Sequence, residues 1–298
     1  MSNVEPRFGR LITAMVTPFN DERELDLDRA QALATRLIEG GNDSLIINGT
    51  TGESPTVFYP QKIELFRAVV EAIGGKAPVI ANVGDNCTAD TVDFAKDVAK
   101  LGVDGFMCVV PYYNKPPQEG MYQHFKTIAD AVELPIILYN IPGRCVVNMK
   151  AETTLRLAND CENVIAVKEA SGKMDQIATI AAAAPEGFSV YSGDDSATYD
   201  VMRLGGAGVI STTGNVAPER MKDLVTKCAE GKWDEAWAAH EALLPLMNGL
   251  FETSNPILVK EALKLVGFPV GGVRLPLIDA TAEQSARLAS IMREVGVL

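Results

Sequence analysis

Short apolar runs alternate along the chain with longer segments in which apolar residues recur at helical spacing. The first run, LITAMVTPF, begins at Leu11, and a helix predicted over residues 27–39 separates it from the second run, SLIING. The alternation continues at intervals of about 28 residues, the spacing of strand–helix units in an α/β protein. The later runs are PVIANVG, DGFMCVVPYY, LPIILYNIPG, NVIAVKEASG, FSVYSGDD and AGVISTTGNV.

Eight such units predict a closed (β/α)8 barrel, the TIM barrel. Because the runs are apolar on both faces, they suit a parallel sheet that is covered by helices. An open doubly wound sheet is the alternative, but its Gly-x-Gly-x-x-Gly fingerprint is absent after the first run.

The chain after the eighth run reads as helical to its end. The predicted helices lie near 218–229, 233–250, 255–266 and 281–295. One of them can close the barrel, and the others form an extension. We therefore predict a barrel over residues 1–225 and a helical C-terminal extension over residues 226–298.

The composition restricts the class of protein and its partners. With 47% hydrophobic and 22% charged residues among 298, the chain resembles a soluble globular protein. No apolar run is long enough to span a bilayer, and MSNVEPRFGRL lacks the apolar stretch of a secretory signal. The net charge of −12, without a basic cluster, argues against nucleic acid or an anionic membrane as a partner. An anionic substrate must therefore be attracted locally, by a placed cation or by backbone donors.

The five cysteines are scattered and form no close pairs. They fit neither a disulfide framework nor a zinc site. We expect free thiols in a reducing cytoplasm, packed in the interior, and no bound metal.

Polar residues stand where the predicted strands end, which is where the active sites of TIM barrels lie. These residues are Thr50 and Thr51, Tyr112 and Tyr113, Tyr139 and Arg144, Lys168 and Glu169, Ser192, Asp194 and Asp195, and Ser211, Thr212 and Thr213.

Lys168 is the most informative of them, because it ends an apolar run, VIAVKEASG. A lysine in the mouth of the barrel is partly desolvated, which lowers its pKa and frees its lone pair. A neutral amine attacks a ketone or aldehyde to form an imine. Tyr139 ends the adjacent predicted strand and could shuttle protons to and from the intermediate. The alternative is that Lys168 is merely the ion-pair partner of a nearby acid.

Other polar residues have structural interpretations. Asp194 and Asp195 could suggest a metal, but adjacent residues point in different directions, so we expect them to cap the next helix. Asn140 is expected to fix a loop. The two histidines, His124 and His240, fall in helical segments and are expected at the surface.

Four motifs, GTTGES, PYYNKP, YNIPGR and VKEASG, occur in this order on these strands. Together they resemble the dihydrodipicolinate synthases, now called 4-hydroxy-tetrahydrodipicolinate synthases. These enzymes belong to the pyruvate-dependent class I aldolases, which include N-acetylneuraminate lyase. The resemblance covers nearly the whole chain and extends to GDD, GVIS, NPILVKEAL and VRLPL.

The resemblance implies a lyase that condenses pyruvate with L-aspartate 4-semialdehyde in the diaminopimelate route to lysine, without a cofactor. It implies that Lys168 forms the imine with pyruvate and that Tyr139 donates and accepts protons. Thr50 would link Tyr139 to Tyr113 in a proton relay, with Tyr113 contributed by a neighbouring subunit. A homo-oligomer follows, and the family suggests a tetramer of two tight dimers.

The resemblance also implies three substrate contacts. Thr51 would hold the pyruvate carboxylate through its hydroxyl and amide, and Ile210 would contact pyruvate through its backbone. Arg144 would bind the carboxylate of the second substrate, because a guanidinium can offer two parallel hydrogen bonds.

The sequence leaves two other functions open. A sister aldolase or lyase acting on sialic acid or a 2-keto-3-deoxy sugar acid shares the lysine and the tyrosine. The threonine pair, the tyrosine pair and Arg144 favour the synthase, because a sugar-acid lyase needs hydroxyl-binding residues in place of the arginine. A non-catalytic sensor of a keto acid would have no need of Lys168 and Tyr139, and both are present.

Some members of the family are inhibited by lysine, which binds at the tight-dimer interface. The matching positions in this chain are Ser54, Tyr59, Lys62, Asn86, Asp90 and Tyr112. Histidines of lysine-sensitive members are replaced here by Tyr59 and Lys62, and a longer acid by Asp90. The Lys62 cation would repel a cationic effector, so we expect weak or absent inhibition by lysine. The alternative is that Lys62 turns into solvent and leaves the pocket usable; Tyr112 could also be ordinary packing or a subunit contact.

Overall fold

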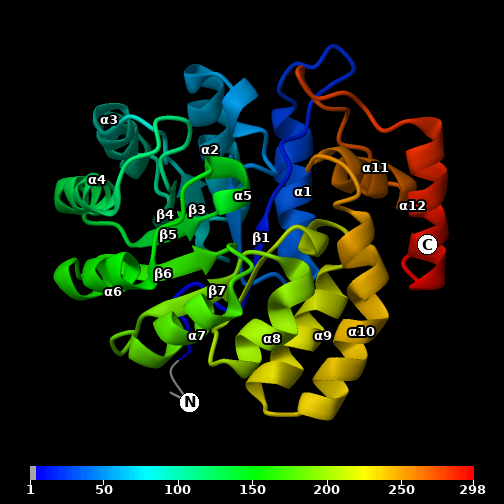
Figure 1. Ribbon diagram of the computed structural model, residues 1–298. Helices are drawn as coiled ribbons and strands as arrows, with labels where there is room; N and C mark the ends of the chain where they lie inside the picture. The colour runs from blue at the N-terminus through cyan, green and yellow to red at the C-terminus, as the bar shows by residue number, and fades with distance from the viewer. Residues whose placement is uncertain (1–4) are drawn as a thin grey trace.

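Eight parallel strands form a closed barrel in a computed structural model that describes residues 5–298 (Figure 1). Each strand pairs with its neighbours in the sequence, and β1 pairs with β8. The barrel is confirmed, and the open-sheet alternative is wrong. The strands are β1 Leu11–Ala14, β2 Ser44–Ile47, β3 Val79–Asn82, β4 Gly105–Val109, β5 Ile136–Asn140, β6 Val164–Glu169, β7 Ser189–Ser192 and β8 Gly208–Ser211.

Helices surround the barrel and alternate with its strands. Those between the strands are α1 Leu27–Glu39, α2 Tyr59–Ile73, α3 Thr88–Ala99, α4 Gln118–Ala131, α5 Pro142–Cys145, α6 Ala151–Asp160, α7 Met174–Ala183 and α8 Thr198–Arg203, with one-turn helices η1 Ser54–Thr56 and η2 Asp195–Ala197. A third one-turn helix, η3 Thr213–Asn215, follows β8. The helix predicted over residues 27–39 is confirmed as α1, whose N-cap Asp26 accepts a hydrogen bond from the Arg29 amide.

The four C-terminal helices lie where the apolar spacing predicts them: α9 Pro218–Ala229, α10 Trp233–Gly249, α11 Ile257–Leu265 and α12 Ala282–Glu294. Helix α9 follows β8 and packs against α8, so it closes the ring of helices. Figure 1 shows α10, α11 and α12 in orange and red along one side of the barrel, with α10 against α9. The division into residues 1–225 and 226–298 stays a prediction, and α9 spans its boundary.

Alternation along each strand divides the core into two layers. Inward residues form a cluster inside the barrel that includes Ile12, Ile46, Ile80, Ile137 and Ala166. Outward residues pack against the helices in a second and larger cluster. This alternation decides which residues at the strand ends face the barrel mouth.

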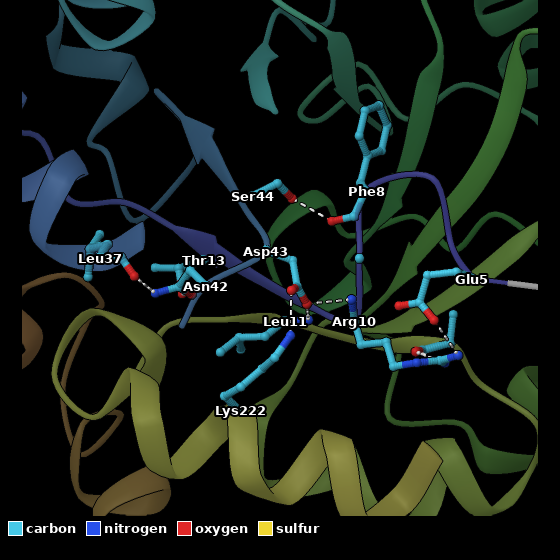
Figure 2. A network of polar contacts seen from close by, with 12 residues as sticks. Glu5, Phe8, Arg10, Leu11, Thr13, Leu37, Asn42, Asp43, Ser44 and Lys222 are labelled. Atoms are coloured by element: carbon cyan, nitrogen blue, oxygen red, sulfur yellow. Dashed lines mark hydrogen bonds and ion pairs between the residues drawn. The ribbon is translucent and has the colours of Figure 1, made fainter. Parts of the chain in front are cut away.

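Polar contacts close the N-terminal end of the barrel (Figure 2). The Asp43 carboxylate accepts hydrogen bonds from the backbone amides of Arg10 at 2.8 Å and Leu11 at 2.9 Å. It also forms an ion pair with Lys222 of α9. These contacts connect the residues at the starts of β1 and β2 with α9. They lie at the N-terminal end of the barrel, which in TIM barrels contributes to stability rather than to catalysis.

Both histidines are buried, so their predicted surface location is wrong. His124 lies on the inward face of α4, with its Nδ1 atom 2.9 Å from the Thr88 hydroxyl. His240 on α10 packs against the rings of Tyr199 and Trp237. Burial lowers the pKa of both imidazoles, which favours the neutral ring that an interior site can accommodate.

The cysteines are free, four of them buried and Cys87 partly buried, in agreement with packing roles. Within residues 5–298, no group of three or more His, Cys, Asp and Glu side chains is arranged to hold a metal ion. In the same part of the chain, no helix combines the length and the apolar character needed to cross a bilayer.

Candidate active site

Lys168 points into the barrel near the C-terminal end of β6. The strand alternation places Ala166 inside the barrel and Val167 outside it, and Lys168 shares the inward parity of Ala166. Lys168 is in register with two inward tyrosines, Tyr139 on the neighbouring strand β5 and Tyr191 on β7. The residue is only 6% exposed.

The charge state of Lys168 follows from this burial. Desolvation lowers the pKa of its ammonium to about 8, the negative charge of Asp195 acts in the opposite direction, and the positive charge of Arg144 lowers the pKa further. Among the described residues no carboxylate forms an ion pair with Lys168. The ion-pair interpretation is therefore unsupported, and a sizeable fraction of the amine is neutral near physiological pH.

Tyr139 is the candidate proton carrier and lies beside Lys168. Its ring centroid lies 4.4 Å from the Lys168 Nζ atom. Burial raises the pKa of the phenol well above its ordinary value near 10, while the Arg144 charge and a hydrogen bond with the Thr50 side chain lower it. The phenol therefore stays protonated at rest and is ready to donate.

The threonine loop, defined here as residues 49–53, lies between β2 and η1. The Thr51 hydroxyl accepts a hydrogen bond from Asn255 Nδ2 at 2.8 Å and lies 3.5 Å from the Thr212 hydroxyl. The Thr17 hydroxyl donates to the Gly52 carbonyl at 2.6 Å. Sequence reasoning missed Asn255, which reaches the site from the loop between α10 and α11, 204 residues away in the chain.

The two aspartates after β7 have different roles. Asp194 caps η2 by accepting a hydrogen bond from the Ser196 amide at 3.0 Å, which confirms its predicted role. Asp195 does not cap; its buried carboxylate accepts from the Ser211 hydroxyl and from the amides of Thr212 at 3.0 Å and Thr213 at 2.9 Å. It therefore braces the end of β8 and supplies a buried negative charge near Lys168.

Asn140 fixes the loop that follows β5, as predicted. Its Oδ1 accepts from the Met149 amide at 3.0 Å, and its Nδ2 donates to the Glu169 carboxylate at 3.0 Å. Glu169 points outward from β6 and also accepts from the Ser171 amide at 2.9 Å. This network braces the segment that carries Arg144.

The remaining candidates differ in exposure. Ile210 is buried inside the barrel on β8, and Arg144 is exposed on α5 at the rim. Tyr113 is 87% exposed and stands in a left-handed turn with φ of 72°. Within one chain Tyr113 is therefore solvated, whereas the Tyr139 side chain with which it would share a relay is buried.

The sequence profile of the dihydrodipicolinate synthetase family matches residues 7–295. The chain belongs to this family. It is 52% identical over 292 residues to the 4-hydroxy-tetrahydrodipicolinate synthase of Moorella thermoacetica, covering 98% of this chain and 100% of that protein. The family and this identity make the chain a lyase, and they agree with the resemblance drawn from its motifs.

Solved structures of the family have the same barrel. The dihydrodipicolinate synthase of Cyanidioschyzon merolae, solved with lysine bound, matches with a TM-score of 0.97 at 45% identity, over 99% of this chain and 100% of that one. A monomeric variant of dihydrodipicolinate synthase matches with a TM-score of 0.95 at 42% identity, over 97% of each chain.

A cavity of about 330 Å³, called here the second cavity to distinguish it from the barrel mouth, lies between α2 and α3. It is lined by Ser54, Tyr59, Lys62, Asn82, Val83, Gly84, Asp85, Asp90, Asp93 and Phe94. Four of the six candidate effector residues line it; the other two, Asn86 and Tyr112, are joined by a hydrogen bond from Asn86 Nδ2 to the Tyr112 carbonyl at 3.1 Å.

Lys62 is one of the residues that line this second cavity. Its ammonium lies 5.6 Å from the Phe94 ring centroid, and burial lowers its pKa. The Tyr59 hydroxyl donates to Asp97 at 2.6 Å. Lys62 therefore faces the cavity rather than open solvent.

Proposed function

We propose that this site condenses pyruvate with L-aspartate 4-semialdehyde to give 4-hydroxy-tetrahydrodipicolinate, in the diaminopimelate route to lysine. The neutral amine of Lys168 attacks the keto carbon of pyruvate, and the keto oxygen leaves as water. Loss of a methyl proton from the imine gives an enamine. Its carbon adds to the aldehyde of the second substrate. The amino group of that substrate then displaces Lys168 and closes the ring.

The single observation that carries this proposal is the Lys168 amine, which is buried inside the barrel mouth, makes no ion pair with any residue of the described range 5–298, and lies 4.4 Å from the centre of a phenol ring. Imine formation needs a neutral nucleophile, and desolvation provides one. It also needs a proton donor for the departing water, which the protonated Tyr139 provides.

The two substrate carboxylates require separate partners in a protein of net charge −12. Thr51 offers a hydroxyl and an amide to the pyruvate carboxylate, and Ile210 offers its backbone beside it. Arg144, at the rim, offers its guanidinium to the carboxylate of aspartate semialdehyde. This places the first substrate deep in the site and the second nearer its mouth.

A coupled assay tests the proposal. The protein is supplied with pyruvate and aspartate semialdehyde, and product is followed through the next reductase of the route. In parallel, release of pyruvate from sialic acid and from 2-keto-3-deoxygluconate is measured. Turnover confined to the first pair supports the synthase, whereas turnover of a sugar acid alone would identify a sister lyase. An absence of any imine with pyruvate would favour the sensor.

We expect kcat/KM for pyruvate to rise with pH up to about 8 and then to level off. The charged amine is inert, so the rate follows the neutral fraction of Lys168, whose pKa burial lowers to about 8. Initial rates between about pH 6 and pH 9 measure this rising limb of the pH–rate profile.

Asp194→Asn is the matched variant for this pH profile. It removes a negative charge that raises the pKa of Lys168 but keeps a residue that can cap η2, so the limb should move to lower pH. A rate that does not vary with pH over this range would contradict the assignment of the limb to Lys168.

We expect lysine to inhibit weakly or not at all. Lys62 lines the second cavity with its ammonium beside Phe94, and the bound amino acid would bring further positive charge to it. A loss of about 1.4 kcal/mol weakens binding tenfold. Initial rates across a lysine titration measure the effect, and the Lys62→His/Asp90→Glu variant should gain inhibition. Strong inhibition of the unaltered protein at physiological lysine levels would contradict this prediction.

The proposed relay requires Tyr113 from a second subunit, and so at least a dimer. The exposure of Tyr113 within one chain supports this requirement. A tetramer of two tight dimers, in the cytoplasm, is the assembly we propose. Size-exclusion chromatography with light scattering distinguishes it from a dimer and from a monomer.

A further inference from the structure

A buried ion pair joins the threonine loop to the C-terminal helices. The Glu53 carboxylate lies 2.6 Å from the Lys260 ammonium, and each side chain is only 2% exposed. Glu53 is the last residue of the threonine loop, and Lys260 lies on α11. The two residues are far apart in the sequence, so only the folded C-terminal helices bring them together.

Backbone groups of the segment after α11 complete the pair. Lys260 Nζ donates to the Gly272 carbonyl at 2.8 Å, and the second oxygen of Glu53 accepts from the Arg274 amide at 2.9 Å. The Phe19 ring closes one side, with its centroid 4.1 Å from Lys260 Nζ. Both side chains are thus held in fixed orientations and are almost fully shielded from bulk water.

The same C-terminal segment holds the residues just after the threonine loop. The Arg274 guanidinium donates to the Thr56 carbonyl at 2.7 Å and to Gln61 Oε1 at 2.8 Å. Glu53 itself has a φ of 55°, in the left-handed region that a residue with a side chain adopts only when its surroundings enforce it. The Glu53 amide donates to the Thr50 carbonyl at 3.0 Å, which folds the loop back on itself. The conformation of Glu53 is therefore coupled directly to the position of the two threonines.

We propose that Glu53 and Lys260 are positioning residues that set the threonine loop for the pyruvate carboxylate, so that the C-terminal helices complete the active site. This inference rests on the proposed role of Thr51 in binding that carboxylate. A buried ion pair contributes little net stability, because well-packed apolar residues of similar size often stabilise a fold equally well. The ion pair instead has a fixed geometry, which selects one conformation of the threonine loop among several that would bury the same surface. Asn255 also helps to position the threonine loop, because it donates a hydrogen bond to the Thr51 hydroxyl from the segment just before α11.

The test compares Glu53→Gln with the double variant Glu53→Gln/Lys260→Met. The single change leaves the Lys260 ammonium buried without its partner and should lower the melting temperature, whereas the double change removes both charges and should restore it. Both variants should need about tenfold more pyruvate for half-maximal imine formation, because the loop no longer presents Thr51 in one position. Borohydride trapping across a pyruvate titration measures this without the second substrate. The kcat at saturating pyruvate should change much less.

Asp43→Asn is the control, because it weakens the polar contacts at the opposite end of the barrel. It should lower the melting temperature without changing half-saturation by pyruvate. The conservative variant Lys260→Arg keeps a cation beside Glu53 and should stay closer to the unaltered protein than the double variant.

Unchanged half-saturation in the double variant would overturn the inference. If the double variant does not fold, unchanged half-saturation in Glu53→Gln below its melting temperature would overturn it as well. An unaltered protein that forms no imine on Lys168 would instead overturn the proposed function.

Discussion

Lys168→Ala is expected to abolish imine formation with pyruvate while the fold is retained. The change removes the amine that lies beside Tyr139 inside the barrel and is proposed to form the imine, and kcat should fall by on the order of 10³-fold or more. The melting temperature should not fall below that of the unaltered protein. Since the folded state lowers the pKa of Lys168 to about 8, folding disfavours its charged form, and this cost applies fully below pH 8. Mass spectrometry after borohydride reduction with pyruvate checks the first part, and thermal unfolding at pH 7 checks the second.

Lys260 is the internal control for this assignment. Burial lowers its pKa to about 8 as well, so a depressed pKa alone does not distinguish the two lysines. Geometry does distinguish them: Lys260 is ion-paired with Glu53 behind the threonine loop, whereas Lys168 faces the barrel interior beside Tyr139. The reduced adduct should therefore appear on the peptide that contains Lys168. An adduct on Lys260, or on any other lysine, would contradict the mechanism.

The barrel itself could be predicted because its signal is local. Each strand is a short apolar run, and each helix has its own spacing of apolar residues, so eight units could be recognised independently. Lys168 stood out for the same reason: a lysine at the end of the run that contains Ala166 and Val167 has the register of an inward residue. Charge and periodicity along one strand were enough to place it.

The residues that hold the active-site loops in place could not be predicted, because they act through contacts between distant segments of the chain. Asn255 and Lys260 lie in or beside helices whose apolar spacing gives no sign that they reach the barrel mouth. Adjacent residues of one type can also differ: Asp194 caps a turn while Asp195 is buried under β8. The turn after β7 sets the direction of each carboxylate. Only Asp195 points toward hydrogen-bond donors at the end of β8, and these donors belong to a different segment of the chain.

Tyr113→Phe is expected to lower kcat strongly with less effect on the KM for pyruvate. The phenol hydroxyl is proposed as a proton carrier rather than a binding contact, so its removal affects turnover more than affinity. Tyr113 is 87% exposed within its own chain, and its turn is held by hydrogen bonds from the Asn114 amide to the Tyr112 carbonyl and from Asn114 Nδ2 to the Asn86 carbonyl. The side chain is thus presented outward by an ordered turn, as a group that acts in a partner's site requires.

Mixing two inactive variants tests whether the site is shared. In a dimer of Tyr113→Phe with Lys168→Ala, one site combines an intact Lys168 with an intact Tyr113 from the other subunit, while the second site lacks the lysine. Random exchange at equal amounts makes half of the dimers mixed, so activity should recover to about a quarter of that of the unaltered protein. Native mass spectrometry must first verify that subunits have exchanged. No recovery after verified exchange would contradict a shared site. If the chain acts alone, as the monomeric variant among its solved relatives is described, Tyr113→Phe by itself should leave turnover nearly unchanged.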